Sequence, residues 1–227
     1  MVVYGKQVCL YILSHHKKRV KSVYIAKKGI LPQSLFEEFG SCIKFLETKW
    51  ADSMSKGGNH QGLLLDVDDF EQTSFNDLKQ SNFLVILDSL SDVGNIGAIT
   101  RSAYALGAEG IIASGVRGLN FAGIARSSSG ALFDMPFLIE QNPLSCINEL
   151  QQLGFQLYGA AMDGDSVKDI KFSQKRVLVL GSEGEGITKR VKAKIDQMVS
   201  IPMQREFDSL NVSAAAAILL HRMSDES

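Results

Sequence analysis

The chain has 227 residues, of which 45% are hydrophobic and 22% are charged, and its formal net charge is −1. This composition predicts a soluble globular protein of one large or two small domains. No apolar run approaches the roughly 20 residues that span a membrane, and the N-terminal charges follow the apolar part, which is the reverse of a signal peptide. We therefore expect a cytoplasmic protein without a membrane partner.

The cysteines and histidines argue against a metal site. The three cysteines lie far apart without paired spacing, so neither a disulfide framework nor a zinc site is indicated, and we expect ordinary core residues. The four histidines also lack the spacing of metal ligands. These residues are Cys9, Cys42, Cys146, His15, His16, His60 and His221.

Positive charge is concentrated at the start of the chain. Residues 1–30 contain several lysines and an arginine but no aspartate or glutamate. A nucleic acid could bind such a patch, whereas lysine runs are also common on surfaces that bind none. Charge alone leaves both interpretations open.

The first third of the chain has the pattern of a small α/β unit. Turn residues and apolar periodicity predict helices and strands in the order helix 6–15, strand 22–26, helix 32–39, strand 42–46 and strand 62–67. The polar segment 68–82 is typical of a linker. We place a first domain at 1–72, a linker at 73–81 and a second domain at 82–227.

The second domain has the pattern of a parallel sheet covered on both faces. Continuous apolar strands at 83–88, 110–114, 155–160 and 177–181 alternate with helical stretches at 95–107, 143–153 and 209–223. Ligands of such sheets bind beyond the carboxyl ends of the strands, so the loops that follow these strands are the candidate site.

The loop after the first of these strands leads into "NIGAITRSAYALGA". A helix from Asn95 places its apolar residues on one stripe and Arg101 on the opposite side, between Ala98 and Ala105. Arg101 is therefore predicted to be exposed, with room for a substrate or a partner beside it. Asn95 also suits a turn or a helix N-cap.

The second loop, in "VLVLGSEGEGITKRV", is rich in glycine. Its glycine order has neither the Rossmann spacing nor a P-loop lysine, and Glu183 and Glu185 lie where a phosphate needs positive surroundings. A dinucleotide fits poorly, and an adenosine with a sulfonium or ammonium group fits better. A tight turn with a solvated acidic edge is the simpler alternative.

The third loop follows a short apolar strand ending at Pro202 and leads into the alanine-rich "SLNVSAAAAILL". A helix needs one capping residue, whereas Ser209, Asn211 and Ser213 are all suited to that role. Capping alone therefore leaves two of these three side chains unexplained. The run Ala214–Ala217 fits close backbone packing, although alanine is also the best helix former.

These three stretches resemble, in order, the motifs of the SpoU branch of the SPOUT RNA methyltransferases. The front of the chain, "VYGKQVCLYIL" and "MSKGGNHQGLLLDV", is similar to the substrate-binding domain of bacterial 23S rRNA guanosine 2′-O-methyltransferases, which has an L30e-like fold. The resemblance implies an α/β fold with a mostly parallel sheet and a C-terminal trefoil knot, S-adenosylmethionine as cofactor, and a homodimer.

The resemblance also implies the site residues. Those that match the cofactor-binding loops are Gly181, Ser182, Glu183, Gly184, Ile201, Pro202, Met203, Leu210 and Asn211. Those that match the catalytic motif residues are Asn95, Arg101, Glu183, Ser209 and Asn211. We expect Arg101 to act as a cation that grips the phosphate beside the target ribose, because a guanidinium does not readily deprotonate. Asn95 and Ser209 would orient the hydroxyl, and Glu183 would place the substrate or order its loop.

For the first domain we predict contacts with RNA from the basic segment and from "GGNHQG". The candidate residues are Lys17, Lys18, Arg19, Asn59, His60 and Gln61. A tight turn explains the glycine pair equally well. The chain also departs from its relatives in having Arg205, Glu206 and Phe207 where a small residue is usual, and Arg205 is a candidate for an RNA phosphate contact.

The predicted function is S-adenosylmethionine-dependent 2′-O-methylation of a guanosine in 23S rRNA, free or in a ribosomal precursor particle. DNA lacks the 2′-hydroxyl and is not expected as a partner. The alternatives are methylation of tRNA and an inactive RNA-binding factor in ribosome assembly. A dinucleotide-dependent oxidoreductase is disfavoured by the glycine order.

Overall fold

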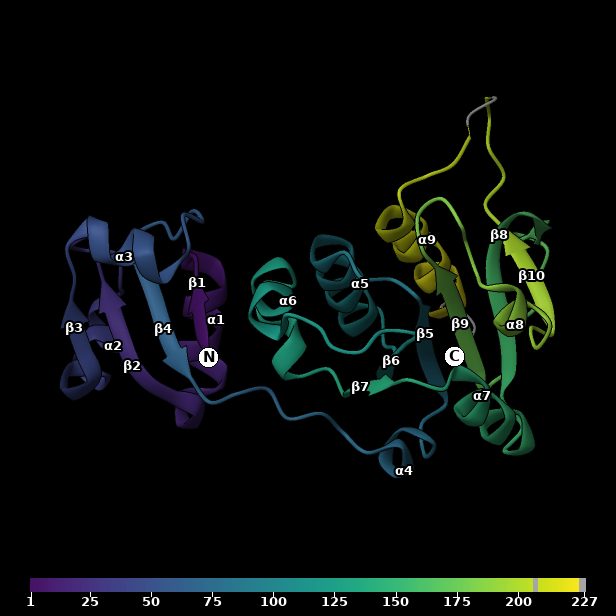
Figure 1. The fold of residues 1–227 in the computed structure, drawn as a ribbon, viewed down its shortest axis with the longest axis horizontal. Coiled ribbons are helices and arrows are strands. Elements are labelled where there is room, and N and C mark those ends of the chain that lie inside the picture. The colour runs from purple at the N-terminus through teal and green to yellow at the C-terminus, as the bar shows by residue number, and fades with distance from the viewer. Residues whose placement is uncertain (206–207, 225–227) are drawn as a thin grey trace.

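The computed structural model describes residues 1–205 and 208–224, so Glu206 and Phe207 of the unusual loop lie outside the described residues. The chain forms a four-stranded sheet and a six-stranded sheet joined by a long connecting segment (Figure 1). The α/β class is confirmed. The trefoil knot concerns how the chain threads, which strand order does not test, and it stays a prediction.

The first sheet is mixed. Its strands are β1 (Val2–Tyr4), β2 (Val20–Ile25), β3 (Ile43–Phe45) and β4 (Leu63–Val67), in the order β1-β4-β2-β3. Only the β2–β3 pair is parallel. The helices are α1 (Lys6–His15), α2 (Gln33–Glu38) and α3 (Thr48–Met54), with short 3₁₀ turns at Lys17–Arg19 and Gly40–Cys42.

Helix α1 forms because its apolar residues recur at helical spacing. Val8 and Ile12, and likewise Cys9 and Leu13, are four residues apart and fully or almost fully buried. Burial raises the pKa of the Cys9 thiol and raises that of Cys146 to about 12, which fits the predicted core role of both residues. Cys42 is only partly buried.

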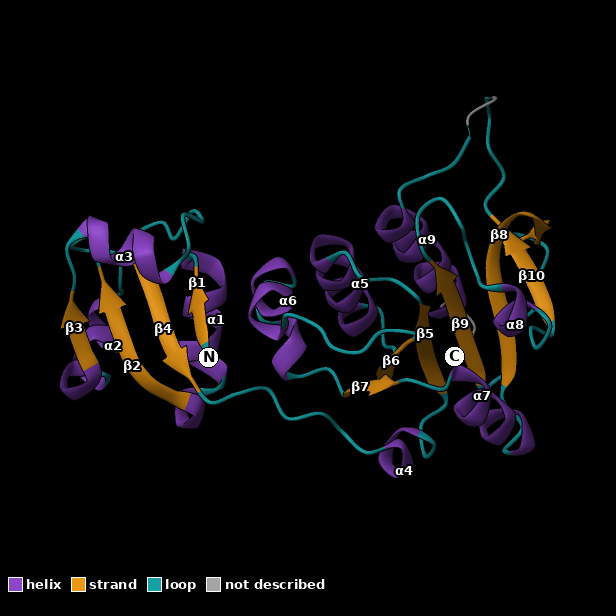
Figure 2. Ribbon diagram, viewed as in Figure 1, coloured by secondary structure: helices purple, strands orange, loops and turns teal. Residues whose placement is uncertain are grey.

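The connecting segment is extended except for one turn of helix, α4 (Phe75–Leu78) (Figure 2). Ser74 caps this turn, because its hydroxyl accepts a hydrogen bond from the Asp77 amide at 3.2 Å. Leu78 is buried against the second sheet, so the segment is anchored to the second domain at its end.

The second sheet is entirely parallel. Its strands are β5 (Phe83–Asp88), β6 (Gly110–Ser114), β7 (Phe137–Glu140), β8 (Gln156–Ser166), β9 (Arg176–Gly181) and β10 (Gln197–Ser200), in the order β10-β8-β9-β5-β6-β7. The helices are α5 (Val93–Ala105), α6 (Phe121–Ser127), α7 (Pro143–Gln152), α8 (Lys189–Lys192) and α9 (Val212–Ser224), with a 3₁₀ turn, η3, at Ala131–Phe133.

Alternating residues of the central strands serve two separate cores. In β5, Val85 and Leu87 belong to the core beneath α5 and α9. Leu84 and Ile86 belong to the core beneath α7 and α8. All six residues of β5 are buried, so the predicted two-sided cover of the sheet is confirmed.

Several elements differ from the sequence prediction. Helix α9 begins at Val212 rather than at 209, so Ser209 and Asn211 lie in the preceding loop. Strand β10 ends at Ser200, two residues before Pro202. The sequence analysis did not predict β1, β7, α3, α4, α6 or α8. These elements are short, and α3 buries only Ala51, so apolar periodicity carries little signal there.

Gly97 lets α5 approach α6 closely, and its replacement tests this packing. A Cβ atom at Gly97 would lie 1.9 Å from Ser127 Oγ and 2.9 Å from the Ser128 amide nitrogen. We expect Gly97→Ala to lower the unfolding free energy by about 1–3 kcal/mol, outweighing the roughly 1 kcal/mol that alanine gains in a helix. Urea unfolding measures the change. Gly118→Ala is the control, because nothing lies within 4 Å of its Cβ position. A Gly97→Ala protein as stable as the parent would contradict the packing argument.

Candidate active site

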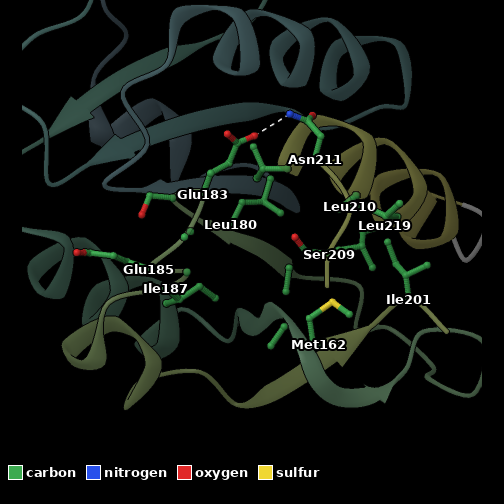
Figure 3. Close-up of a pocket in the computed structure, with 18 of the residues that line it drawn as sticks. Met162, Leu180, Glu183, Glu185, Ile187, Ile201, Ser209, Leu210, Asn211 and Leu219 are labelled. Atoms are coloured by element: carbon green, nitrogen blue, oxygen red, sulfur yellow. Dashed lines mark hydrogen bonds between the residues drawn. The ribbon is translucent and has the colours of Figure 1, made fainter. Parts of the chain in front are cut away.

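A cavity of about 630 Å³ opens at the carboxyl edge of the six-stranded sheet (Figure 3). The loop after β9 forms one wall, segments 198–203 and 208–212 form a second, and residues 160–162 of β8 form another. The cavity lies where ligands of open parallel sheets bind. Two of the three predicted loops therefore meet around one cavity.

The loop after β9 is a tight turn closed by its own backbone. The Ser182 amide donates to the Gly186 carbonyl at 3.2 Å, and the Gly186 amide donates to the Ser182 carbonyl at 3.0 Å. Gly184 and Gly186 have φ angles of 92° and 69°, which favour glycine. The tight turn predicted as an alternative to a ligand site is therefore present, and it also lines the cavity.

One carboxylate joins all three predicted motifs at the rim of the cavity. Glu183 Oε1 accepts hydrogen bonds from Asn95 Nδ2 at 3.0 Å and from Asn211 Nδ2 at 2.7 Å. Asn211 Nδ2 also lies 3.0 Å from Asn95 Oδ1, which closes a triangle of side chains. Residues 88 and 28 positions away in sequence thus meet at Glu183.

The helix caps explain which of these side chains are available. Asp92, not Asn95, is the N-cap of α5, and its carboxylate accepts from the Asn95 amide at 2.7 Å. The interpretation of Asn95 as a cap is therefore wrong, and its side chain is directed to Glu183 instead. Asn211 caps α9 and also contacts Glu183. Its Oδ1 accepts from the Ser213 amide at 2.9 Å, while its Nδ2 donates to Glu183.

The lining of the cavity suits an adenosine that carries a positive charge. Apolar side chains from both loops can enclose a flat base, and they include Leu180, Ile187, Ile201, Met203, Leu210 and Leu219. Among the described residues, three carboxylates, those of Glu183, Glu185 and Asp208, line the same cavity beside a single cation, Lys192. This balance favours a sulfonium or ammonium group and disfavours a dinucleotide's phosphates. Of the predicted cofactor residues, Pro202 alone is absent from the lining.

Arg101 lies in a second cleft rather than in this cavity. It projects from α5 six residues beyond Asn95, and its Nη1 donates to Ser129 Oγ at 3.3 Å. It is exposed, as predicted. The structure therefore brings Asn95, Glu183 and Asn211 together, places Ser209 on the cavity wall, and leaves Arg101 beside the first domain.

The basic segment of the first domain lies near the junction of the two domains. Lys17 Nζ pairs with Glu38 Oε1 at 2.7 Å, and Lys18 is exposed. The Arg19 guanidinium lies 5.8 Å from the centre of the Phe133 ring, which belongs to the second domain. Arg19 therefore lies at the junction of the two domains, whereas Lys17 is paired within the first domain.

The loop of "GGNHQG" is held by its own hydrogen bonds. His60 is 9% exposed, with Nε2 3.0 Å from Asp52 Oδ1 and Nδ1 3.0 Å from the Gly62 amide. Gln61 Oε1 accepts from the Lys6 amide at 2.8 Å, and Asn59 Oδ1 accepts from the Gln61 amide at 3.2 Å. The His60 side chain thus orders the loop, and the RNA contacts predicted for Asn59, His60 and Gln61 stay predictions.

Asp88 is a site-supporting residue that the sequence analysis did not single out. It ends β5, is 1% exposed, and its Oδ2 accepts from the Thr188 amide at 2.7 Å. It thereby holds the chain that leaves the glycine loop. The sequence feature that could have indicated this role is the aspartate at the end of the apolar run "FLVILD", because a buried carboxylate requires a hydrogen-bond partner.

Residues 1–205 and 208–224 contain neither a metal-binding cluster nor a membrane-spanning helix. In this part of the chain no group of three or more histidine, cysteine, aspartate or glutamate side chains is arranged to hold a metal ion. No helix there combines the length and the apolar character needed to cross a lipid bilayer.

Comparison with known proteins agrees with this geometry. Residues 82–221 match the SpoU rRNA Methylase family, and residues 2–73 match the RNA 2′-O ribose methyltransferase substrate binding family. The chain is 31% identical to the 23S rRNA (guanosine-2′-O-)-methyltransferase RlmB of Yersinia pestis, over 96% of this chain and 94% of that protein. It is 33% identical to a tRNA/rRNA methyltransferase of Mycobacterium avium, over 86% of this chain and 66% of that protein.

The fold also matches solved structures. The SpoU methyltransferase AviRb of Streptomyces viridochromogenes, in complex with the cofactor AdoMet, superimposes with a TM-score of 0.79. The match covers 99% of this chain and 89% of that chain, at 24% identity. Both sheets are therefore part of a known architecture.

Proposed function

The chain belongs to the SpoU rRNA methylase family, and on that premise we propose that its substrate is 23S ribosomal RNA and its target a guanosine. The reaction class is S-adenosylmethionine-dependent methylation of a ribose 2′-oxygen in RNA. The first domain, which matches a substrate-binding family over residues 2–73, is proposed to hold the RNA.

The observation that carries this proposal is the meeting of Asn95, Glu183 and Asn211 at the rim of the cavity. Bound S-adenosylmethionine supplies an electrophilic methyl group on a sulfonium. The apolar walls would hold the adenosine, and the carboxylates of Glu183 and Asp208 would favour the positively charged end. The triangle of side chains fixes the two loops relative to α5, so Glu183 orders the site.

The nucleophile is a ribose hydroxyl, which reacts poorly until its proton is lost. Asn95 and Ser209 are proposed to orient it, since both lie at the edge of the cavity. Arg101 is proposed to bind the phosphate beside the target ribose and to stabilise the developing alkoxide, with that phosphate or a water accepting the proton.

We propose further that the protein is a homodimer, as the resemblance implies. Arg101 lies outside the cofactor cavity of its own chain, in the cleft beside the first domain. On α9, Ala214 and Ile218 are exposed one turn apart, and 43% of Ile218 remains accessible. An apolar face of this kind is what a second copy would cover.

The test of the substrate is to incubate the protein with labelled S-adenosylmethionine and, separately, with unmodified 23S rRNA and unmodified tRNA. Label in 23S rRNA, mapped to one guanosine, is the expected result. Label only in tRNA would replace the proposal by the tRNA alternative. Cofactor binding without label in either RNA would call for a precursor ribosomal particle as substrate, and no cofactor binding at all would favour an inactive RNA-binding factor.

The basic segment gives a separate prediction about RNA affinity. Lys18 is exposed, so replacing it by glutamine should weaken RNA binding and reduce the slope of log affinity against log salt by about 0.7–0.9, the loss of one phosphate contact. Fluorescence anisotropy at four salt concentrations measures the slope. Lys171→Gln, at an exposed lysine between β8 and β9, is the control. An unchanged slope in Lys18→Gln would remove Lys18 from the RNA interface.

A further inference from the structure

A second cleft, of about 700 Å³, lies between the two domains. Helix α1 of the first domain supplies one wall with Gln7, Tyr11 and Ser14. Helix α5 and the turn after α6 supply the other wall, with Arg101, Tyr104 and Ser129. The cleft therefore exists only because α1 is docked on the second domain, and it is separate from the cofactor cavity.

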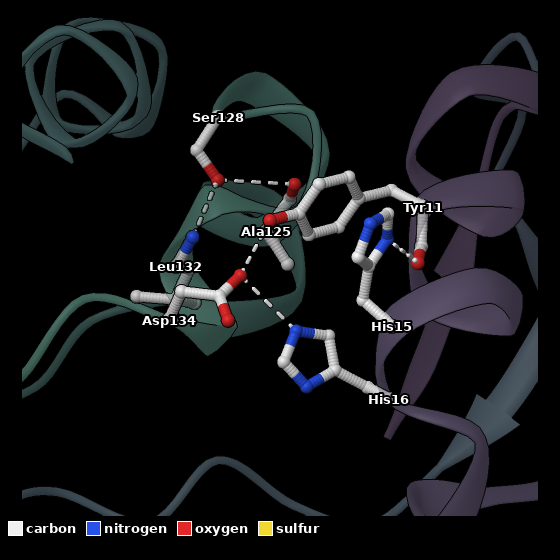
Figure 4. Close-up of polar contacts among 7 residues, drawn as sticks. All are labelled: Tyr11, His15, His16, Ala125, Ser128, Leu132 and Asp134. Atoms are coloured by element: carbon white, nitrogen blue, oxygen red, sulfur yellow. Dashed lines mark hydrogen bonds and ion pairs between the residues drawn. The ribbon is translucent and has the colours of Figure 1, made fainter. Parts of the chain in front are cut away.

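The docking of α1 is built by specific contacts (Figure 4). The Tyr11 hydroxyl donates to Asp134 Oδ2 at 2.6 Å, and His16 Nε2 lies 3.1 Å from the same oxygen. Burial and the bond to Asp134 raise the pKa of the Tyr11 phenol, so it stays a donor. The Tyr11 ring packs on Gly130, where φ is 99° and a Cβ atom would lie 2.5 Å from Tyr11 Cδ1.

A second contact supports the same arrangement. Arg126 of α6 donates a hydrogen bond to the Tyr4 hydroxyl, and its guanidinium lies 4.7 Å from the centre of the Tyr4 ring. Tyr4 in turn leaves no room for a side chain at position 58. The first domain thus contacts the second at two places, through Tyr11 of α1 and through Tyr4 of β1.

The chemistry of the lining points to a nucleotide. Arg101 is the one cation among the residues that line this cleft in the described chain, and no carboxylate lines it, so an anion is favoured. Tyr104 is 45% exposed, so packing within the chain leaves part of this aromatic side chain accessible. Aromatic rings of this kind stack with unpaired bases. The exposed Gln7 amide offers both a donor and an acceptor to a base edge.

The distance from the methylation site indicates which nucleotide this is. Arg101 follows Asn95 by six residues on α5, a rise of about 9 Å at 1.5 Å per residue. The two sites have no lining residue in common, so one base does not occupy both. Arg101 is proposed to bind the phosphate beside the target ribose, so the nucleotide in its cleft is the one that adjoins the target.

We propose that the cleft between α1 and α5 binds the nucleotide that adjoins the methylated one, with its base stacked on Tyr104 and its edge contacted by Gln7. This inference rests on the proposed function of Arg101 as a phosphate ligand. It gives the first domain a part in selecting the sequence around the target, beyond holding the RNA. Gln7 and Tyr104 are then specificity-determining residues supplied by different domains.

The test compares binding of two RNA fragments by the full-length protein. Both are centred on the nucleotide that the parent protein methylates, in whichever RNA accepts the label, and the second lacks the adjoining base on both sides. Tyr104→Ala should weaken binding of the intact fragment about 5- to 150-fold and leave binding of the abasic fragment unchanged. Tyr104→Phe, which keeps the ring, should bind as the parent does. Gln7→Ala should reduce the preference of the parent among fragments that differ only in the adjoining base.

Controls separate this inference from the function on which it rests. Gln33→Ala, at an exposed glutamine of α2, should change neither affinity nor preference. An equal loss of affinity for intact and abasic fragments in Tyr104→Ala would overturn the proposal, since that is the result of a structural defect. Label in tRNA instead of 23S rRNA would refute the proposed substrate, while the same binding comparison on the labelled RNA would still decide the role of the cleft.

Discussion

Replacing Arg101 by lysine is expected to lower the rate of methyl transfer by about 10²- to 10³-fold, the loss seen when one preorganised donor to a developing oxyanion is removed. Lysine keeps the positive charge but lacks the planar fork that binds two phosphate oxygens at once. Arg101 lies outside the cofactor cavity, so the affinity for S-adenosylmethionine should stay at the value of the parent.

Single-turnover methylation at saturating RNA and cofactor measures this rate, and calorimetric titration measures the cofactor affinity. The control is Arg190→Lys on α8, the helix packed on the opposite face of the sheet, and it should leave the rate unchanged. A full rate in Arg101→Lys would remove the forked phosphate contact from the mechanism. A loss of cofactor affinity would show instead that Arg101 supports the cavity.

Gly181→Ala is expected to weaken S-adenosylmethionine binding by about 10- to 100-fold. A Cβ atom at Gly181 would lie 2.0 Å from the Gly186 carbonyl carbon and 2.2 Å from the Ile187 amide nitrogen. Both are backbone atoms, so no side-chain rotation relieves the clash. The turn closed by Ser182 and Gly186 must open, and it is a wall of the cavity.

Titration of the Gly181→Ala protein with cofactor tests this account of the loop. Gly40→Ala provides the comparison, because no atom lies within 4 Å of its Cβ position. Circular dichroism should show that Gly181→Ala keeps the parent's secondary structure, which separates a local change from unfolding. Parent-like affinity would mean that the closed turn is not needed to bind the cofactor.

The fold of the second domain was largely readable from the sequence. Strands β5 and β9 are continuous apolar runs, because both of their faces pack against helices. The start of α9 was placed three residues early, since Ser209, Asn211 and Ser213 are all good caps and the sequence does not rank them. The structure selects Asn211, whose side-chain Oδ1 accepts from the Ser213 amide.

The sequence predicts which residues form the candidate site better than it predicts the contacts between them. The motifs named Asn95, Glu183 and Asn211, but which side chain bonds which depends on tertiary packing across 88 residues. The sequence analysis grouped Arg101 with Asn95 as catalytic motif residues, but the cleft that holds Arg101 is formed by the docking of α1, which no local pattern shows. The docking of α1 depends on Tyr11 and Asp134, which are 123 residues apart and carry no shared local pattern.

The most direct measurement is the position of the methyl group on the RNA. After transfer from labelled S-adenosylmethionine to 23S rRNA, alkaline hydrolysis cleaves every linkage except the one next to a methylated 2′-oxygen. The account predicts that the label is recovered in an alkali-stable dinucleotide whose 5′ member is guanosine, and that this product is absent with Arg101→Ala. Label recovered in a mononucleotide, on the base, would contradict transfer to the ribose and with it the roles assigned to Asn95, Arg101 and Ser209.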